Sequence, residues 1–186
     1  MGYFRKMKVY DKVSRHLARG HKIVRTKWID TNKGDQVNPD YRSRLVAMEF
    51  NEYSDPSLFA ATPPLEAMRY IIHRAATNRA DGKRFSVMTV DVSRAYFNAV
   101  ATRDVFIEIP KEDREPGDEA MVGKLRLCLY GTRDAAFNWS ETVAKQLEES
   151  GYKRGKAFPA IYFNHEKEVA VMVHGDDFLG FGPVSK

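Results

Sequence analysis

FSVMTVDV, residues 85–92, is a short apolar segment with β-branched side chains and one aspartate, Asp91, near its end. Its length and composition predict a strand that ends beside Asp91. A second acidic position follows late in the sequence, where Gly175-Asp176-Asp177 separates the apolar segments 169–173 and 178–181. This arrangement predicts a hairpin with paired aspartates at its tip. Together the segments predict an antiparallel sheet with carboxylates at the ends of its strands.

Two long helices are predicted outside these strands. The first begins at residues 62–64, with Thr62 as its cap, and ends at Asp81-Gly82, whereas the second covers residues 134–150. The buried face of the first helix is expected to hold apolar residues at helical spacing: Leu65, Met68, Ile72 and Ala75. Further strands are predicted at residues 23–29, 41–50, 105–109, 124–129 and 161–164, whereas residues 1–20 are expected to be irregular. Strands mixed with two long helices indicate an α+β fold with an antiparallel sheet.

The positive charge of the chain is concentrated at its N-terminus. The formal net charge of the 186 residues is +5, and residues 1–30 hold nine basic groups against two acidic ones. A basic arm of this kind suits a polyphosphate partner, because each neutralised phosphate releases counterions. A solvated surface segment without a partner explains the same charges equally well.

Cysteine content and hydropathy limit the cellular compartments in which the protein is expected. Cys128 is the single cysteine, so an internal disulfide is excluded and a reducing compartment fits best. No apolar run approaches the roughly 18 residues of a membrane span, and the N-terminus shows no secretory signal. The length suffices for one sizeable core or for two small lobes.

Asp91, Asp176 and Asp177 are the candidates for chemistry. Each is explained singly as an ordinary cap or turn residue. Three carboxylates at strand ends that met at one edge of a sheet would repel one another unless a cation lay between them. Oxygen ligands suit Mg²⁺, and two such ions assist phosphoryl transfer. The sequence contains no Cys/His cluster typical of zinc and no Walker-type glycine loop.

Several blocks of the sequence resemble, in order, the motifs of copia-type retrotransposon reverse transcriptases. The blocks are RSRLVA (42–47) for KARLVA, FAATPP (59–64) loosely for FAPV, DVSRAYF (91–97) for DVxxAYF, LYGTRDAA (129–136) for LYGLKQAP, Trp139 for the tryptophan that follows it, and HGDDF (174–178) for YVDD. Each block alone is weak, but the ordered set is specific.

The resemblance implies a right-hand polymerase with fingers and palm. Residues 1–186 would be a single reverse transcriptase domain fragment, with about 1–90 mostly fingers, including the basic arm, and about 85–186 mostly palm. An antiparallel palm sheet would pack on the two long helices. Nine residues follow Asp177 in this sequence, so the thumb is expected to be absent.

The resemblance also implies RNA-directed DNA synthesis and a role for each matched residue. A primer 3′-hydroxyl attacks the α-phosphate of a deoxynucleotide, pyrophosphate leaves, and two Mg²⁺ ions, or Mn²⁺ in their place, assist. Asp91 and Asp176 are the expected main metal ligands, joined by the Val92 carbonyl and by Asp177, which acts less directly. Residues expected to bind the nucleotide are Arg42, Arg44, Tyr96, Tyr130 and Gly131, and the Tyr96 ring would exclude a ribose 2′-hydroxyl. Residues expected to contact nucleic acid are Lys27, Arg133 and Gly175.

The sequence departs from the family pattern at two of these blocks. His174-Gly175 replaces Tyr-Val before the paired aspartates, which puts the primer contact in question, although Gly175 still permits the turn. Thr132, Asp134 and Ala136 replace Leu, Gln and Pro in the second block. Asp134 therefore either adds negative charge near a nucleic-acid path or caps the helix that follows it.

The implied partners are an RNA template, a DNA primer, a dNTP and the rest of a retrotransposon polyprotein, without a membrane. The implied location is intracellular, either in cytoplasmic virus-like particles or in the nucleus. The alternative is a catalytically inactive relic that acts as a nucleic-acid-binding module. Chemistry alone also permits another Mg²⁺-dependent phosphotransferase, which the ordered blocks disfavour.

Overall fold

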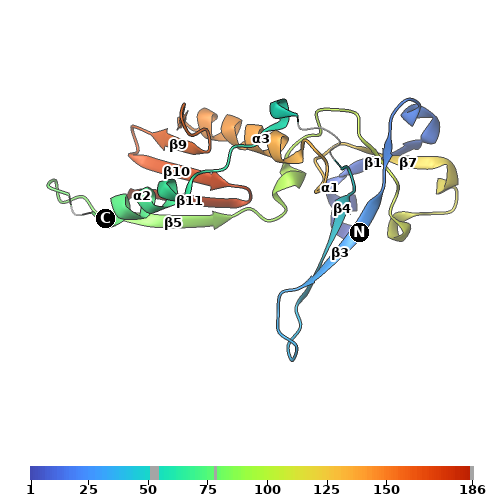
Figure 1. The fold of residues 1–186 in the computed structure, drawn as a ribbon, viewed down its shortest axis with the longest axis horizontal. Coiled ribbons are helices and arrows are strands. Elements are labelled where there is room, and N and C mark those ends of the chain that lie inside the picture. The colour runs from blue at the N-terminus through green and yellow to red at the C-terminus, as the bar shows by residue number, and fades with distance from the viewer. Residues whose placement is uncertain (51–54, 78, 185–186) are drawn as a thin grey trace. The chain divides into compact units, whose positions relative to one another are not determined.

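The computed structural model describes residues 1–50, 55–77 and 79–184, and the chain forms two compact units (Figure 1). Unit 1 contains Met1–Leu58 and Tyr96–Trp139. Unit 2 contains Phe59–Ala95 and Ser140–Lys186. Each unit is therefore built from two separate parts of the sequence.

Unit 2 is organised around a five-stranded antiparallel sheet in the order β5-β11-β10-β9-β8. Its strands are β5 (Phe85–Asp91), β8 (Lys153–Arg154), β9 (Ile161–Asn164), β10 (Val169–His174) and β11 (Asp177–Pro183). The sheet confirms the predicted antiparallel pairing and the mixed α and β content. β5, β9 and β10 are mainly apolar segments that contain β-branched residues, whose side chains pack well on a pleated surface.

One face of this sheet is covered by α2 (Leu65–Ala76) (Figure 1). Ala67 and Ile71 of the helix are buried against a cluster that includes Phe181 of β11. The predicted buried face was wrong, because Leu65, Met68 and Ile72 are exposed. The helix carries apolar residues around most of its circumference, so spacing alone selects the wrong stripe. It also begins after Pro64 and ends at Ala76, inside the predicted bounds of 62–64 and 81–82.

The second long helix, α3 (Ala135–Glu149), belongs to unit 2 from Ser140 onward. The Asn164 side chain donates to the Ser150 carbonyl at 3.4 Å, and Arg154 donates to Glu141 at 2.8 Å. Asn164 and Phe163 point to opposite faces of β9, and Phe163 lies in the cluster under α2. The two helices therefore cover opposite faces of the sheet.

Unit 1 holds a four-stranded sheet, in the order β1-β7-β6-β2, and a two-stranded hairpin, β3-β4, that extends from it (Figure 1). Its elements are α1 (Gly2–Met7), β1 (Tyr10–Ser14), β2 (Ile23–Val24), β3 (Thr26–Asn32), β4 (Tyr41–Ala47), β6 (Phe106–Ile107) and β7 (Met121–Leu125). The predicted strand at 23–29 is split between β2 and β3, so it serves both sheets. Short 3₁₀ helices lie at Arg15–Ala18, Pro56–Leu58, Ala95–Asn98, Lys111–Asp113 and Asp118–Ala120.

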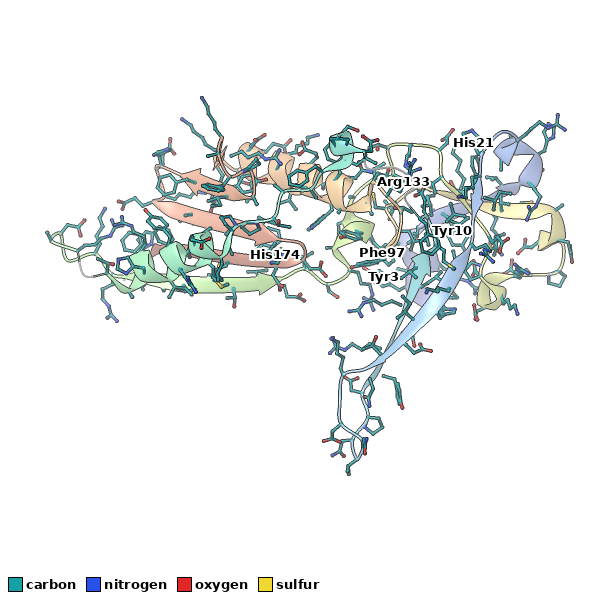
Figure 2. The ribbon with its side chains drawn as sticks, viewed as in Figure 1. Tyr3, Tyr10, His21, Phe97, Arg133 and His174 are labelled. Carbon is teal, nitrogen blue, oxygen red and sulfur yellow. The ribbon has the colours of Figure 1, made fainter. Side chains whose placement is uncertain are left out.

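The core of unit 1 is built around aromatic residues near the N-terminus. The ring of Phe97 packs edge-on against Phe4 with centroids 4.9 Å apart, and Tyr3 lies 6.0 Å from it (Figure 2). Val9 and Leu129 are fully buried in the same cluster. The first 20 residues were expected to be irregular, but α1 and β1 form because they complete this core.

Part of the basic arm is occupied by structural contacts. The Asp113 carboxylate is buried and accepts hydrogen bonds from the Arg5 Nε, at 2.6 Å, and from the Tyr10 hydroxyl. The Lys12 Nζ donates to the Asp113 carbonyl and to the Asp118 carboxylate, both at 2.7 Å. Arg5 and Lys12 therefore tie the arm to the 110–120 segment, which reduces the charge left for a partner.

Acid is expected to destabilise unit 1 through Asp113. Burial favours the neutral carboxyl, but hydrogen bonds from Tyr10 and Arg5 outweigh it and lower the pKa of Asp113. A lowered folded-state pKa contributes stability above the unfolded value of about 4, and this stability is lost as the pH falls through the folded value. We expect Asp113→Asn to lower the unfolding free energy at pH 7 by about 1–3 kcal/mol.

Thermal unfolding followed by circular dichroism between pH 7 and pH 2 checks this expectation. The gap between Asp113→Asn and the unchanged protein should shrink as the pH falls. Asp40→Asn, at an exposed surface pair 3.5 Å from Arg42, is the matched control and should change little. A gap that stays constant down to pH 2 would contradict the role assigned to Asp113.

Candidate active site

Strand pairing in unit 2 places Asp91 and Asp177 directly opposite each other. Asp91 is the last residue of β5 and Asp177 is the first of β11, and the two are register partners. On the other side of Asp177, His174 of β10 is its register partner. Asp91, Asp177 and His174 thus form one row across three strands, on the sheet face that α2 covers further along.

The backbone hydrogen bonds show how close the backbones of Asp91 and Asp177 lie. The Val92 amide donates to the Asp176 carbonyl at 2.9 Å, so Val92 and Asp176 form a hydrogen-bonded pair. Pairs alternate along an antiparallel ladder, which makes Asp91 and Asp177 a non-hydrogen-bonded pair, with Cα atoms about 4.5 Å apart and side chains on the same face. Both residues are exposed to solvent.

Two facing carboxylates are the donor set that a hard divalent cation prefers. Mg²⁺ keeps several waters and takes substrate phosphates as further ligands, so one or two carboxylates are sufficient. Across residues 1–50, 55–77 and 79–184, no group of three His, Cys, Asp or Glu side chains is placed to hold a metal ion. The strand register therefore brings together the pair Asp91 and Asp177, whereas Asp176 enters the site through its backbone contact with Val92.

Gly175 and Asp176 form the two-residue turn between β10 and β11. Gly175 has φ +61, in the left-handed region that favours glycine, and a Cβ built there meets no atom within 4 Å. The backbone conformation, rather than crowding, thus accounts for glycine at this position. His174, at the end of β10, is exposed beside the turn (Figure 2).

Three of the predicted basic residues share one face of the β3–β4 hairpin in unit 1. The register pairs Lys27 with Val46 and Ile29 with Arg44, and places Arg42 opposite Thr31. Side chains alternate along each strand, so Lys27, Arg42 and Arg44 point to the same side. All three are exposed, and they form a basic face that suits phosphate groups.

Tyr96, Tyr130 and Gly131 also meet in unit 1. The rings of Tyr96 and Tyr130 lie 4.5 Å apart, and the Ala47 amide donates to the Tyr130 carbonyl at 2.7 Å. Gly131 has φ +86, and a Cβ at this residue would lie 2.0 Å from the Ala47 carbonyl oxygen. Glycine is required there because the segment runs directly against the end of β4.

A charged network that the sequence did not predict holds this segment in place. Arg103 forms two hydrogen bonds to the Glu49 carboxylate and a third, at 3.0 Å, to the buried Asp134. The Arg133 amide also donates to Glu49, at 3.0 Å. Burial favours neutral Glu49, but the hydrogen bonds from Arg103 and Arg133 outweigh it and lower the pKa of Glu49.

This network answers the question raised by Asp134. Its carboxylate accepts from Arg103 and, at 3.1 Å, from the Asn138 side chain, and it is buried. The charge is therefore neutralised inside unit 1 and does not lie on an open nucleic-acid path. Glu49 and Arg103 lie 54 positions apart in the sequence, so no local sequence pattern identifies them as partners.

The site residues fall into both units. Unit 2 holds the residues expected at the metal and the primer: Asp91, Val92, Gly175, Asp176 and Asp177. Unit 1 holds those expected at the nucleotide and the template: Lys27, Arg42, Arg44, Tyr96, Tyr130, Gly131 and Arg133. None of the helices in the described part of the chain combines the length and apolar character that crossing a membrane requires.

Comparison with known proteins gives a consistent result. The model of the family described as "Reverse transcriptase (RNA-dependent DNA polymerase)" matches residues 7–183. The retrovirus-related Pol polyprotein from transposon TNT 1-94 of Nicotiana tabacum is 24% identical over 174 residues, covering 89% of this chain and 13% of that protein. The retrovirus-related Pol polyprotein from transposon RE1 of Arabidopsis thaliana is 26% identical over 161 residues, covering 84% and 11%. The chain thus spans about an eighth of the length of these curated relatives.

Proposed function

Because this chain belongs to the reverse transcriptase (RNA-dependent DNA polymerase) family, we propose that it carries the polymerase site of a copia-type retrotransposon polyprotein. The proposed reaction is the transfer of a deoxynucleotide to a primer 3′-hydroxyl on an RNA template. The observation that carries the proposal is the pairing of Asp177 with Asp91. It brings two family motifs together at the ends of neighbouring strands.

In the proposed reaction the primer oxygen bonds to the α-phosphorus, the bond to the β-phosphate breaks, and pyrophosphate leaves. Two Mg²⁺ ions, or Mn²⁺ in their place, would stabilise the negative charge on the attacking and leaving oxygens. Asp91, Asp176, Asp177 and the Val92 carbonyl would hold them, with Asp91 and Asp176 as main ligands. The strand register, which pairs Asp91 with Asp177 at the ends of β5 and β11, supports this assignment.

Other residues would orient the nucleotide and the nucleic acid. Arg42 and Arg44 would bind the triphosphate, because a guanidinium offers paired donors to phosphate oxygens. The Tyr96 ring, which lies against Tyr130, would exclude a ribose 2′-hydroxyl, and Gly131 would lie near the nucleotide. Lys27, Arg133 and Gly175 would contact template or primer.

We further propose unit 2 as the palm and unit 1 as the fingers. Unit 2 contains the antiparallel sheet and the paired carboxylates, whereas unit 1 contains the projecting basic hairpin. If the boundaries follow the compact units, residues 96–139, which the sequence assigned mostly to the palm, belong to the fingers. The proposed partners are an RNA template, a DNA primer, a dNTP and the rest of the polyprotein, and the proposed location is the cytoplasm or the nucleus.

Primer extension tests this function. The 186-residue chain is incubated with a primed RNA template, dNTPs and Mg²⁺, and elongated products are separated by size. We expect Mg²⁺-dependent extension that prefers deoxynucleotides to ribonucleotides. Extension that persists undiminished in excess EDTA would contradict the metal-assisted mechanism.

A second candidate, a nucleic-acid-binding module without catalysis, is favoured by the basic face of the β3–β4 hairpin. In that case Lys27, Arg42 and Arg44 would bind phosphates of RNA instead of a nucleotide triphosphate. Binding would be salt-dependent and indifferent to Asp177→Asn.

Replacing Arg42 and Arg44 together by Ala distinguishes the two candidates. If they bind the triphosphate, the KM for dNTP should rise about 10–100-fold through the loss of charge-assisted hydrogen bonds. RNA affinity, measured by fluorescence anisotropy, should then change little. Lys33→Ala, on an exposed residue of the same hairpin, is the matched control. Weaker RNA binding with an unchanged KM would instead favour the binding module.

A further inference from the structure

Unit 2 contains an open cavity of about 420 Å³ that the proposed function does not use. Phe59 and Ala61, from the segment before α2, form one side of it. The other side is formed by Arg154, at the end of β8, and by Gly155, Lys156 and Pro159 of the β8–β9 loop. The Val173 amide donates to the Ala160 carbonyl at 2.9 Å, so this loop borders the same end of the sheet as His174. The cavity therefore lies at the carboxylate end of the sheet.

The β8–β9 loop has a fixed shape. The Gly155 amide donates to the Ile161 carbonyl at 2.7 Å, and the Arg154 Nε donates to the Pro159 carbonyl at 2.9 Å. A Cβ at Gly155 would lie 2.7 Å from the Phe158 carbonyl oxygen, so the loop closes only with glycine there. A ligand would find this wall of the cavity already ordered, which lowers the entropic cost of binding.

Two phenylalanines are unusually exposed in this region, one at the cavity and one on the adjoining loop. Phe59, which lines it, is 71% exposed, and Phe158, on the loop, is 52% exposed. Within the described residues neither ring stacks on another aromatic ring, so their π-faces are available. Exposed aromatic rings beside a groove are the platforms on which unpaired bases stack.

The segment that contains β8 and this loop is strongly basic. Residues 151–160, GYKRGKAFPA, contain Lys153, Arg154 and Lys156 and no acidic residue. Arg154 is occupied by Glu141, at 2.8 Å, whereas Lys153 and Lys156 are exposed and form no ion pair with any described residue. Lys156 and Phe59 both line the cavity, and the exposed Lys153 and Phe158 lie on the adjoining segment. Cations and aromatic rings are therefore available for the alternating phosphates and bases of a nucleic-acid strand.

We propose that this cavity, together with the adjoining residues 153–158, binds a single-stranded segment of RNA or DNA, with bases stacked on Phe59 and Phe158 and phosphates held by Lys153 and Lys156. A duplex hides the faces of its bases, and an acidic peptide would use the cations but not the rings. The proposal goes beyond polymerase activity and does not depend on it, because strand binding needs neither metal nor nucleotide.

Fluorescence anisotropy of a labelled twelve-residue oligothymidylate, titrated with the full chain in EDTA at low salt, tests the proposal. Phe59→Ala and Phe158→Ala should each weaken binding at least about fivefold through lost stacking. Lys156→Ala should weaken it and lower the slope of log affinity against log salt by about 0.7. Phe158→Trp should retain affinity, and the new tryptophan should be quenched by the oligonucleotide.

Two matched variants elsewhere on unit 2 serve as controls. Tyr70→Ala removes an exposed ring on α2, and Lys167→Ala removes an exposed cation between β9 and β10, and both should stay within about twofold. Phenylalanine variants that bind like these controls would overturn the proposal. Polyglutamate or fully paired DNA with the same dependence on Phe59 and Phe158 would also overturn it. EDTA keeps the result separate from any failure of the polymerase.

Discussion

Primer extension on RNA is expected to disappear when Asp91 or Asp176 is replaced by Asn. Each change removes a negative oxygen from the proposed metal site but preserves the size of the side chain. Loss of a metal ligand that stabilises the transferring phosphate costs several kcal/mol of transition-state stabilisation, or roughly a thousandfold in rate. Asp177→Asn should also lower the rate strongly, because Asp177 faces Asp91 across the strand pair.

Single-turnover extension with saturating template and dNTP measures this effect separately from binding. Asp81→Asn is the matched control in the same unit, because Asn retains the oxygen that accepts from the Lys83 amide at 3.0 Å. This control should extend at the normal rate. Extension that survives unchanged in Asp91→Asn or Asp176→Asn would remove these residues from the mechanism.

The largest loss of stability is expected from Arg103→Ala. The change leaves two carboxylates without their main partner, those of Glu49 and the buried Asp134. Breaking a buried pair costs about 3–5 kcal/mol, and the part-exposed Arg103 side chain reduces this to about 2–4 kcal/mol. For a chain of this length the Tm should fall by about 10 °C.

Denaturant or thermal unfolding of the variant measures the change. Arg126→Ala is the matched control, because Arg126 lies 3.7 Å from Asp11 in an exposed pair and should cost under about 1 kcal/mol. Adding Asp134→Asn to Arg103→Ala should recover part of the loss, since it removes the buried unpaired charge. An Arg103→Ala loss as small as that of Arg126→Ala would show that the network contributes little.

Local sequence pattern was sufficient for several strands of the sheet in unit 2. Residues 85–91 and 161–164 form strands as predicted, because apolar and β-branched residues there are bounded by turn residues. The hairpin at Gly175-Asp176 was also predicted, from its turn chemistry. The expectation that Asp91 lies near the paired aspartates came from motif order, since the two strands are far apart in sequence, and their pairing is consistent with it.

Features that depend on tertiary contacts were missed. The spacing of Leu65 and Met68 indicated a buried stripe on α2, but the small side chain of Ala67 lets the neighbouring stripe approach the sheet. Tyr10–Ser14 is a strand despite its polar residues, because it pairs along its whole length with β7. The contact of Glu49 with Arg103 follows from no local pattern, since distant segments form it.

Binding of a divalent cation tests the central claim most directly, that Asp91 and Asp177 act as one site. Mn²⁺ titration followed by electron paramagnetic resonance compares the unchanged chain with Asp91→Asn, Asp177→Asn and the double variant, without substrate. We expect each single variant to weaken Mn²⁺ binding and the double variant to be little worse than either, because both changes damage the same site. Affinity that is unchanged in both single variants, or losses that simply add in the double variant, would contradict a shared site.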